Sequence, residues 1–252
     1  MNDIKLKLDV YKAYNTKKIT KEQKESCEYM IEATKDNELA FNLSKWKRGS
    51  NYNILFITGL SGSGKSTLAS KMAKENEAIH VEVDLLEHND ILFQEEKPDK
   101  GNQIMKEYME KNYGSAHKFQ TSDMVSFTKE VIKFLTFMLK YAKEHKDDLF
   151  IVEGIQIADA STWNPSNTKV DGKNVEQVLN LSMKLMDLIQ SYPVIVKNTS
   201  VLASIYRSAR REGLGTYVKT FNSLASIKEY INFYMEMNRN KKQFIKNMKK
   251  NA

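Results

Sequence analysis

Several features that mark secreted or membrane proteins are missing from this sequence. The chain of 252 residues has no run of about 18 apolar residues, so we expect no membrane-spanning helix. Residues 1–15 alternate lysine with apolar side chains and lack the apolar core of a secretion signal. The one cysteine, Cys27, excludes an intramolecular disulfide and fits a reducing cytosol. We therefore expect a cytoplasmic protein.

Internal repeats and low-complexity segments are also missing, and the composition is typical of a globular protein. Hydrophobic residues make up 41% of the chain and charged residues 28%. The length fits one large α/β domain, or one domain with an extension. The formal net charge of +7 suits anionic partners such as nucleotides, nucleic acid or phosphorylated metabolites.

From residue 52 onward, short apolar segments alternate with helical patterns. Segments with the composition of buried strands are 52–58, 78–84, 148–157 and 192–198. Segments with helical periodicity are 66–75, 122–145, 175–191, 201–213 and 226–249. This alternation predicts an α/β fold in which a mostly parallel sheet is covered by helices on both faces.

Residues 1–50 precede this alternation and have a different pattern. A short strand is predicted for residues 4–11, and a helix begins at Thr20 and runs to Trp46, with a break near residues 35–37. A fifth strand of the sheet has one weak candidate, residues 215–221. The expected organisation is a helical N-terminal extension (1–50), a main domain (51–221) and a basic C-terminal helix (222–252) packed on the domain or extending it.

The strongest motif is the sequence GLSGSGKS at residues 59–66, which matches G-x-x-x-x-G-K-[ST] at every fixed position. Glycines let such a loop turn its backbone N–H groups inward, and the following helix directs its positive end at the same point. Lys65 can reach the β and γ phosphates of a nucleotide, and Ser66 can offer its hydroxyl to Mg²⁺. The motif also follows a predicted strand and opens a predicted helix. It therefore predicts binding of a nucleoside triphosphate by Gly59, Ser61, Gly62, Ser63, Gly64, Lys65, Ser66 and Thr67.

The longer string ITGLSGSGKSTLA, residues 57–69, resembles the P-loop of adenylylsulfate kinases. More broadly it is similar to the P-loop kinase superfamily, which includes zeta-toxin-like, uridine-kinase-like and polynucleotide-kinase-like enzymes. A looser resemblance, in strand order and charged positions, covers residues 52–215. The resemblance implies the P-loop NTPase fold, a three-layer α/β/α arrangement with a mostly parallel sheet, and it implies ATP and Mg²⁺ as ligands.

Two acidic residues follow strands at positions that matter in this superfamily. Asp84 is the last residue of HVEVD. At this place the resemblance implies a carboxylate that takes a proton from the acceptor hydroxyl or orients it by a hydrogen bond. The alternative is that Asp84 caps a helix starting at Leu85. Glu153 follows the strand in LFIVEG, which is similar to uridine-kinase-like enzymes. The resemblance implies that Glu153 serves Mg²⁺ together with Ser66, and the alternative is a structural ion pair. Asp159 is interpreted as a surface-loop residue.

Arginine is scarce, yet Arg207, Arg210 and Arg211 lie within five positions of a predicted helix. P-loop kinases carry arginines on a lid helix, where they neutralise charge on the transferred phosphoryl group. The resemblance implies this role here, together with catalytic roles for Lys65, Asp84 and Glu153. The alternative is an ordinary basic helix face exposed to solvent.

The sequence thus favours an ATP- and Mg²⁺-dependent phosphotransferase acting on a small anionic acceptor, such as a nucleoside, nucleotide or nucleotide sugar. One alternative is a nucleotide-gated interaction protein that hydrolyses ATP slowly or not at all. A second is a polynucleotide 5′-end kinase, because the six basic residues between Arg239 and Lys250 could contact phosphates. For those residues we prefer a solvated helix end. The sequence does not indicate the oligomeric state.

Overall fold

The computed structural model describes residues 37–87, 93–94, 97–114, 124–163, 172–212 and 224–250. The strand predicted at 4–11, the first part of the predicted N-terminal helix and the candidate fifth strand at 215–221 lie outside these residues. The described part of the chain has the predicted α/β architecture. None of its helices is long and apolar enough to cross a membrane.

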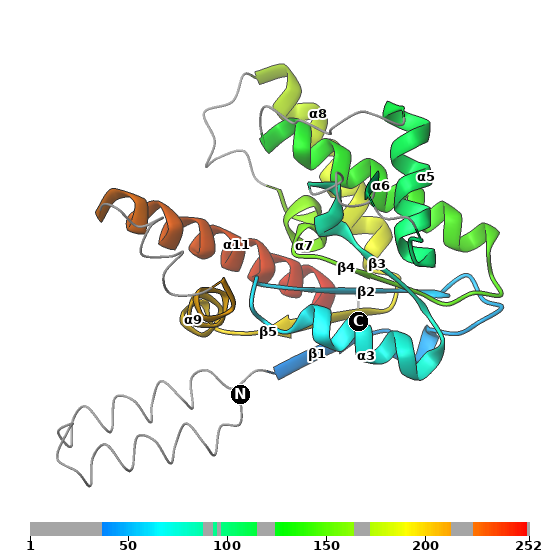
Figure 1. Ribbon diagram of the computed structural model, residues 1–252. Helices are drawn as coiled ribbons and strands as arrows, with labels where there is room; N and C mark the ends of the chain where they lie inside the picture. The colour runs from blue at the N-terminus through cyan, green and yellow to red at the C-terminus, as the bar shows by residue number, and fades with distance from the viewer. Residues whose placement is uncertain are drawn as a thin grey trace, which may run out of the picture.

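A five-stranded sheet with the order β1-β5-β2-β4-β3 forms the centre of the fold (Figure 1). Its strands are β1 (Asn37–Phe41), β2 (Ile54–Gly59), β3 (Ile79–Glu82), β4 (Phe150–Glu153) and β5 (Val194–Asn198). The pairs β5–β2, β2–β4 and β4–β3 are parallel, whereas β1 runs antiparallel to β5. The four parallel strands are those predicted from the sequence, with bounds that differ by a few residues.

Strand β1 corrects the prediction of a helix running to Trp46. Its side chains alternate in burial, because Phe41 is buried in the core and Leu39 packs against it, while Glu38 is exposed. Glu38 also accepts a hydrogen bond of 2.7 Å from Lys197 Nζ on the neighbouring strand. Burial of every second side chain and pairing with the open edge of β5 therefore favour a strand here over the helix that local propensity predicts.

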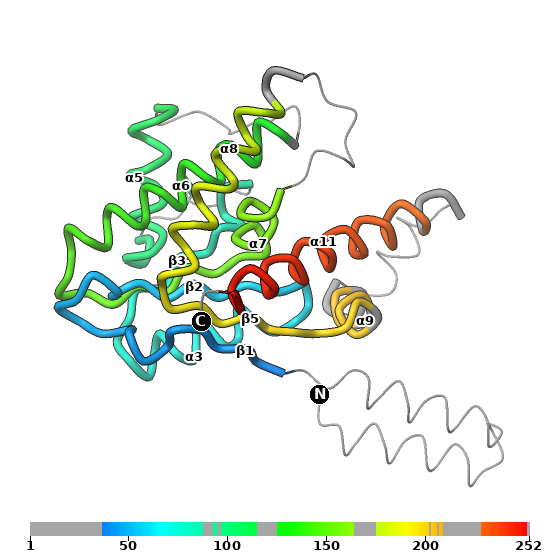
Figure 2. Tube along the Cα trace, turned by 180° about the vertical axis from the view of Figure 1, so that it is seen from behind, coloured from blue at the N-terminus to red at the C-terminus, as the bar shows by residue number. Residues whose placement is uncertain are grey.

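Helices cover both faces of the sheet, as the opposite views in Figures 1 and 2 show. They are α3 (Lys65–Asn76), α5 (Lys100–Tyr113), α6 (Met124–Glu144), α7 (Gln156–Ser161), α8 (Gly172–Ile189), α9 (Val201–Glu212) and α11 (Leu224–Lys250), with 3₁₀ helices η1 (Leu43–Lys45) and η2 (Val83–Leu86). Helix α3 lies on one face and α5 to α8 on the other, while α11 contacts α7 and α9. Helix α7 corrects the prediction that a strand continues to residue 157 and is followed by a polar loop.

The central strand β2 shows why the sheet has two apolar faces. Leu55 and Ile57 pack with Ala69 of α3, whereas Ile54 and Phe56 face the larger core under α5, α6 and α8. All four strand side chains are fully buried. Because successive side chains of a strand point to opposite faces, a continuous apolar run is what a sheet covered on both sides requires.

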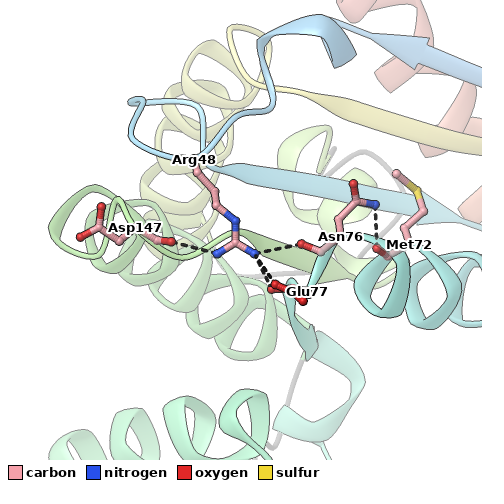
Figure 3. Close-up of polar contacts among 5 residues, drawn as sticks. All are labelled: Arg48, Met72, Asn76, Glu77 and Asp147. Carbon is pink, nitrogen blue, oxygen red and sulfur yellow. Dashed lines mark hydrogen bonds and ion pairs between the residues drawn. The ribbon is translucent and has the colours of Figure 1, made fainter.

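Arg48 fastens the segment before β2 to the end of α3 (Figure 3). Its guanidinium donates hydrogen bonds of 3.0 Å to the carbonyl oxygens of Asn76, Glu77 and Asp147. Asn76 in turn donates to the carbonyl of Met72 at 2.9 Å. A cation at a helix C-terminus pairs with carbonyls that have no partner inside the helix. Helix α3 is thereby fixed at the end opposite the glycine-rich loop.

We predict that Asn53→Ala strongly destabilises the fold. The side chain of Asn53 is fully buried at the start of β2, and its Nδ2 donates to the carbonyls of Ala142, His145 and Asp148 at 2.8–3.0 Å. Removing the donor breaks all three hydrogen bonds, although the carbonyls of Ala142 and His145 each keep a backbone N–H donor. The loss should lower the free energy of unfolding by about 2–3 kcal/mol. Urea denaturation measures this change.

The matched control for that experiment is Asn76→Ala, which removes one hydrogen bond from an exposed asparagine. It should lower the free energy of unfolding by less than about 1 kcal/mol. Equal losses in the two variants would show that the Asn53 contacts do not hold the end of α6 to the sheet.

Candidate functional site

The glycine-rich loop leaves the carboxyl end of β2 and turns directly into α3. Gly62 and Gly64 have φ values of +75° and +84°, a left-handed conformation that side chains other than glycine rarely adopt. The Ser63 N–H donates to the Leu60 carbonyl at 3.0 Å and closes the turn. The glycine positions are therefore required by the path of this loop.

The first turn of α3 offers backbone donors to an anion. Gly64 occupies the N-cap position and has no side chain that could cap the helix. Within the described part of the chain, the N–H groups of Gly64, Lys65 and Ser66 have no hydrogen-bond acceptor. Unpaired N–H groups and the helix dipole together attract negative charge. A phosphate group fits the chemistry of this helix end.

Glu153 is placed against this helix start by the pairing of β4 with β2, in which Glu153 is opposite Ile57. Ser66 Oγ donates to Glu153 Oε1 at 2.8 Å, and Lys65 Nζ lies 3.9 Å from Glu153 Oε2. The side chain of Glu153 is 1% exposed and that of Lys65 is 7% exposed. Burial raises the pKa of Glu153 to about 7, against the opposing effects of the Lys65 charge and the Ser66 hydrogen bond.

More potential ligands surround Glu153 at the ends of β3 and β4. Glu82 is opposite Glu153 in the parallel pair, and ligand atoms of His80, Glu82 and Glu153 lie within 4.8 Å of one another. Burial lowers the pKa of His80, although Glu82 and Asp99 act in the opposite direction. A neutral imidazole can offer a nitrogen to a metal ion.

Asp84 lies beyond β3, in the 3₁₀ helix η2. Its Oδ1 atom is buried and has no hydrogen-bond partner among the described residues, and the same is true of Glu153 Oε2. Buried carboxylate oxygens without donors are costly unless a cation or water compensates them. A divalent cation with Ser66 and Glu153 among its ligands therefore fits this corner, and oxygen ligands are those that Mg²⁺ prefers.

Helix α9 packs against the outer side of the glycine-rich loop. A Cβ atom on Gly62 would lie 2.7 Å from the Ser204 carbonyl oxygen and 2.9 Å from Ser208 Oγ. Positions 207 and 211 each follow one of these serines by three residues, so they lie near the helix face that contacts the loop. Position 210 lies further round the helix. The side chains of Arg210 and Arg211 are outside the described part of the structure.

A chain of hydroxyl groups joins the loop to α11, and sequence reasoning missed it. Tyr234 Oη donates to Ser208 Oγ at 2.9 Å, and Ser208 Oγ lies 3.4 Å from Ser61 Oγ. Tyr230 Oη donates to Tyr234 Oη at 3.3 Å. Ser61 was predicted as a phosphate-loop residue, but serines and tyrosines on two distant helices carry no motif that would have linked them to it.

The remaining predicted binding residues differ in exposure. Ser63 is 1% exposed, and a Cβ on Gly59 would lie 2.9 Å from its Oγ, so this side chain turns back across the loop. Thr67 is exposed on α3. The structure therefore brings Lys65, Ser66 and Glu153 into contact, whereas no hydrogen bond in the described part of the structure joins the exposed Thr67 to them.

Asp159 corrects another prediction. It lies in helix α7 rather than in a surface loop, and its Oδ1 accepts a hydrogen bond of 3.1 Å from Asn240 Nδ2 of α11. Burial raises the pKa of Asp159 to about 7; the Asn240 hydrogen bond lowers it and the charge of Glu236 raises it further. Asp159 lines a small cavity of about 80 Å³. A larger groove of about 530 Å³ lies between α7, α8 and α11 and includes none of the loop residues.

No protein-family model and no curated protein matches this chain. The geometry of the site therefore carries the functional argument.

We predict a pH-dependent stability difference between the wild-type protein and Glu153→Gln. The folded-state pKa of Glu153 is about 7, above its ordinary value of 4.5. Its contribution to stability is therefore complete below pH 4.5 and is lost as the pH rises through 7. Between pH 5 and pH 8 the free energy of unfolding of the wild type should fall more than that of Glu153→Gln, by on the order of 3 kcal/mol. Urea denaturation at the two pH values measures the difference, and parallel pH dependences would contradict it.

We also predict that Gly62→Ala is more damaging than Gly64→Ala. Both residues have positive φ, so both variants carry backbone strain. Only the Gly62 variant adds a collision with α9, because no atom lies within 4 Å of a Cβ on Gly64. The free energy of unfolding should be lower for Gly62→Ala by a further 1–3 kcal/mol, approximately the effect of overpacking. Thermal and urea denaturation compare the two variants directly. Equal stability would show that α9 moves away from the added methyl group without cost.

Proposed function

We propose that this protein is an ATP- and Mg²⁺-dependent phosphotransferase of the P-loop kinase type. The observation that carries the proposal is the meeting of Lys65 and Ser66, from the first turn of α3, with the buried carboxylate of Glu153. The order of the parallel strands supports it, since β2 leads into the loop and lies between β4 and β5. Both features agree with the three-layer fold that the sequence resemblance implies.

The nucleotide-binding role falls to the loop and the first turn of α3. The unpaired N–H groups of Gly64, Lys65 and Ser66 donate to phosphate oxygens of ATP. Lys65 exchanges its ion pair with Glu153 for the β and γ phosphates. Ser66 and Glu153 would hold Mg²⁺, and Glu82, with a carboxylate oxygen within 4.8 Å of one of Glu153, would contribute through water. When bound, this ion supplies positive charge that balances the phosphates.

The transfer itself needs a base for the acceptor hydroxyl and positive groups that neutralise the charge on the transferred phosphoryl group. Asp84, whose Oδ1 has no hydrogen-bond donor among the described residues, accepts the proton of the acceptor hydroxyl. The acceptor oxygen bonds to the γ phosphorus as the bond to the bridging oxygen breaks, and ADP leaves with that oxygen. Arg207 and Arg211 lie near the loop-facing side of α9, where guanidinium groups can neutralise the developing charge.

A nucleotide-gated interaction protein remains the second candidate, and one observation favours it. The hydroxyl chain from Ser61 through Ser208 to Tyr234 connects the loop to both α9 and α11. Binding of a nucleotide in the loop would therefore change the contacts of both α9 and α11. Labelled ATP separates the candidates: label on an acceptor supports the phosphotransferase, whereas nucleotide-dependent partner capture that survives Asp84→Ala, without transfer, supports gating.

We predict that Lys65→Ala weakens ATP binding about 10- to 100-fold, the usual effect of losing a charged hydrogen bond to phosphate. Isothermal titration of the protein with ATP and Mg²⁺ measures the affinity. The control is Lys71→Ala, because Lys71 is a largely exposed lysine on the same helix, paired with Glu75. Unchanged affinity in Lys65→Ala, or no ATP uptake by the folded wild type, would overturn the proposal.

A further inference from the structure

A small, partly open pocket lies between α6, α7 and α11. Three aromatic side chains line it, one from each wall: Phe127, Trp163 and Phe233. Phe127 and Trp163 are at most 9% exposed, whereas Phe233, on the open side, is 52% exposed. The polar lining of the pocket comes mainly from amide and carboxyl groups, and it contains no lysine or arginine among the described residues. This composition is unlike that of a phosphate-binding pocket.

The pocket adjoins the candidate site through α7 and α11. Gln156, which lines it, follows Glu153 by three residues and folds back over Gly154, since a Cβ on Gly154 would lie 2.6 Å from Gln156 Oε1. On the other side, Met237 lines the pocket and also packs in the cluster around Leu60 of the loop. The short link between Glu153, the last residue of β4, and Gln156, the first of α7, thus separates a molecule held here from the strand end.

The charges in the pocket favour a cation. Asp159 and Glu236 both line it and are close enough for the charge of Glu236 to act on Asp159. Gln156 is 8% exposed, and its carbonyl oxygen is buried without a hydrogen-bond partner among the described residues. Two carboxyl groups and a free amide oxygen call for a ligand that donates hydrogen bonds. Aromatic rings beside acidic groups are a recurring environment for ammonium groups.

We propose that this pocket binds the ammonium group of a small amine-bearing alcohol, and that the hydroxyl of this compound is the phosphoryl acceptor. The inference rests on the proposed phosphotransferase function and names the class of its second substrate. It replaces the anionic acceptor expected from the net charge. That charge belongs to the whole chain, whereas the lining of this pocket is acidic.

The size of the pocket limits the substrate. A volume of about 80 Å³ is well below the 300–1,000 Å³ of pockets that enclose drug-sized ligands. It suits an ammonium head group with one or two carbons, as in ethanolamine. In the transfer step, the ammonium stays between Asp159 and Glu236. Transfer requires the hydroxyl to come within hydrogen-bond distance of Asp84, where its proton passes to that carboxylate and its oxygen bonds to the γ phosphorus as ADP departs.

The test uses the full chain at pH 8 with ethanolamine as the probe and ethylene glycol as a matched neutral probe. Saturation-transfer NMR titrations should give a dissociation constant on the order of 1 mM for ethanolamine, as expected for so small a ligand. Ethylene glycol has the same size and a hydroxyl group but no charge, and it should bind at least about tenfold more weakly. Equal binding of the two probes would overturn the proposal.

Two isosteric variants locate the site. Glu236→Gln and Asp159→Asn should each weaken ethanolamine binding about tenfold, while Glu229→Gln, an exposed glutamate on the same helix, should leave it unchanged. Circular dichroism confirms that each variant is folded. Unchanged binding in both folded pocket variants would overturn the proposed site.

ATP titration and transfer of label on the same samples separate this inference from the proposed function. ATP binding without ethanolamine binding overturns the pocket alone, whereas ethanolamine binding without ATP uptake overturns the phosphotransferase. The acceptor role requires label on ethanolamine, choline or 3-aminopropanol. Binding with no label on any of the three would overturn that role.

Discussion

The contact on which the candidate site depends is the burial of Glu153 between Lys65 and Ser66. Removing a carboxylate from water at the end of an apolar strand is unfavourable, and its pKa of about 7 shows that the two partners compensate only part of this cost. Both partners belong to the first turn of α3, so the contact fixes the start of that helix against β4. Because the loop runs between β2 and α3, its path follows from the same contact. The fold thus maintains an unfavourable acid next to a helix end that has unpaired N–H groups.

The outer side of the loop is constrained as tightly as its inner side. Leu60 packs with Tyr234 and Met237 of α11, and Gly62 has no room for a side chain beside α9. The loop is therefore held between the sheet and two helices that come late in the sequence. Any ligand that alters the loop must act on α9, which carries Arg207, because the two are in direct contact. In a kinase or a nucleotide-gated switch, this contact would link nucleotide binding at the loop to the position of α9.

The sequence predicted those parts of the fold that local pattern determines. Strands β2, β4 and β5 begin with continuous apolar runs, β3 alternates apolar and polar residues, and α3 follows a glycine motif. These elements could therefore be predicted from local sequence alone. The sequence also predicted that Ser66 and Glu153 act together, because Ser66 belongs to that motif and Glu153 is an acidic residue directly after a strand. Strand β1 could not be predicted in this way, since Asn37–Phe41 becomes a strand through pairing with the free edge of β5. Asp159 was misjudged because its burial depends on α11, about 80 residues further along the chain.

Helix α11 shows how a basic segment can still be an integral part of a site. Its sequence suggests a solvated tail, yet Tyr234, Met237 and Phe244 are buried, as is Lys241, whose Nζ donates to the Thr199 carbonyl at 2.8 Å. Positions 234, 237, 241, 244 and 248 follow helical spacing, so one stripe faces the core while the other basic residues of the helix point outward. The same stripe reaches the loop through Tyr234, the segment after β5 through Lys241 and the acidic pocket through Met237. Net charge therefore describes only the outer surface of this helix, because its buried side consists of apolar side chains and Lys241.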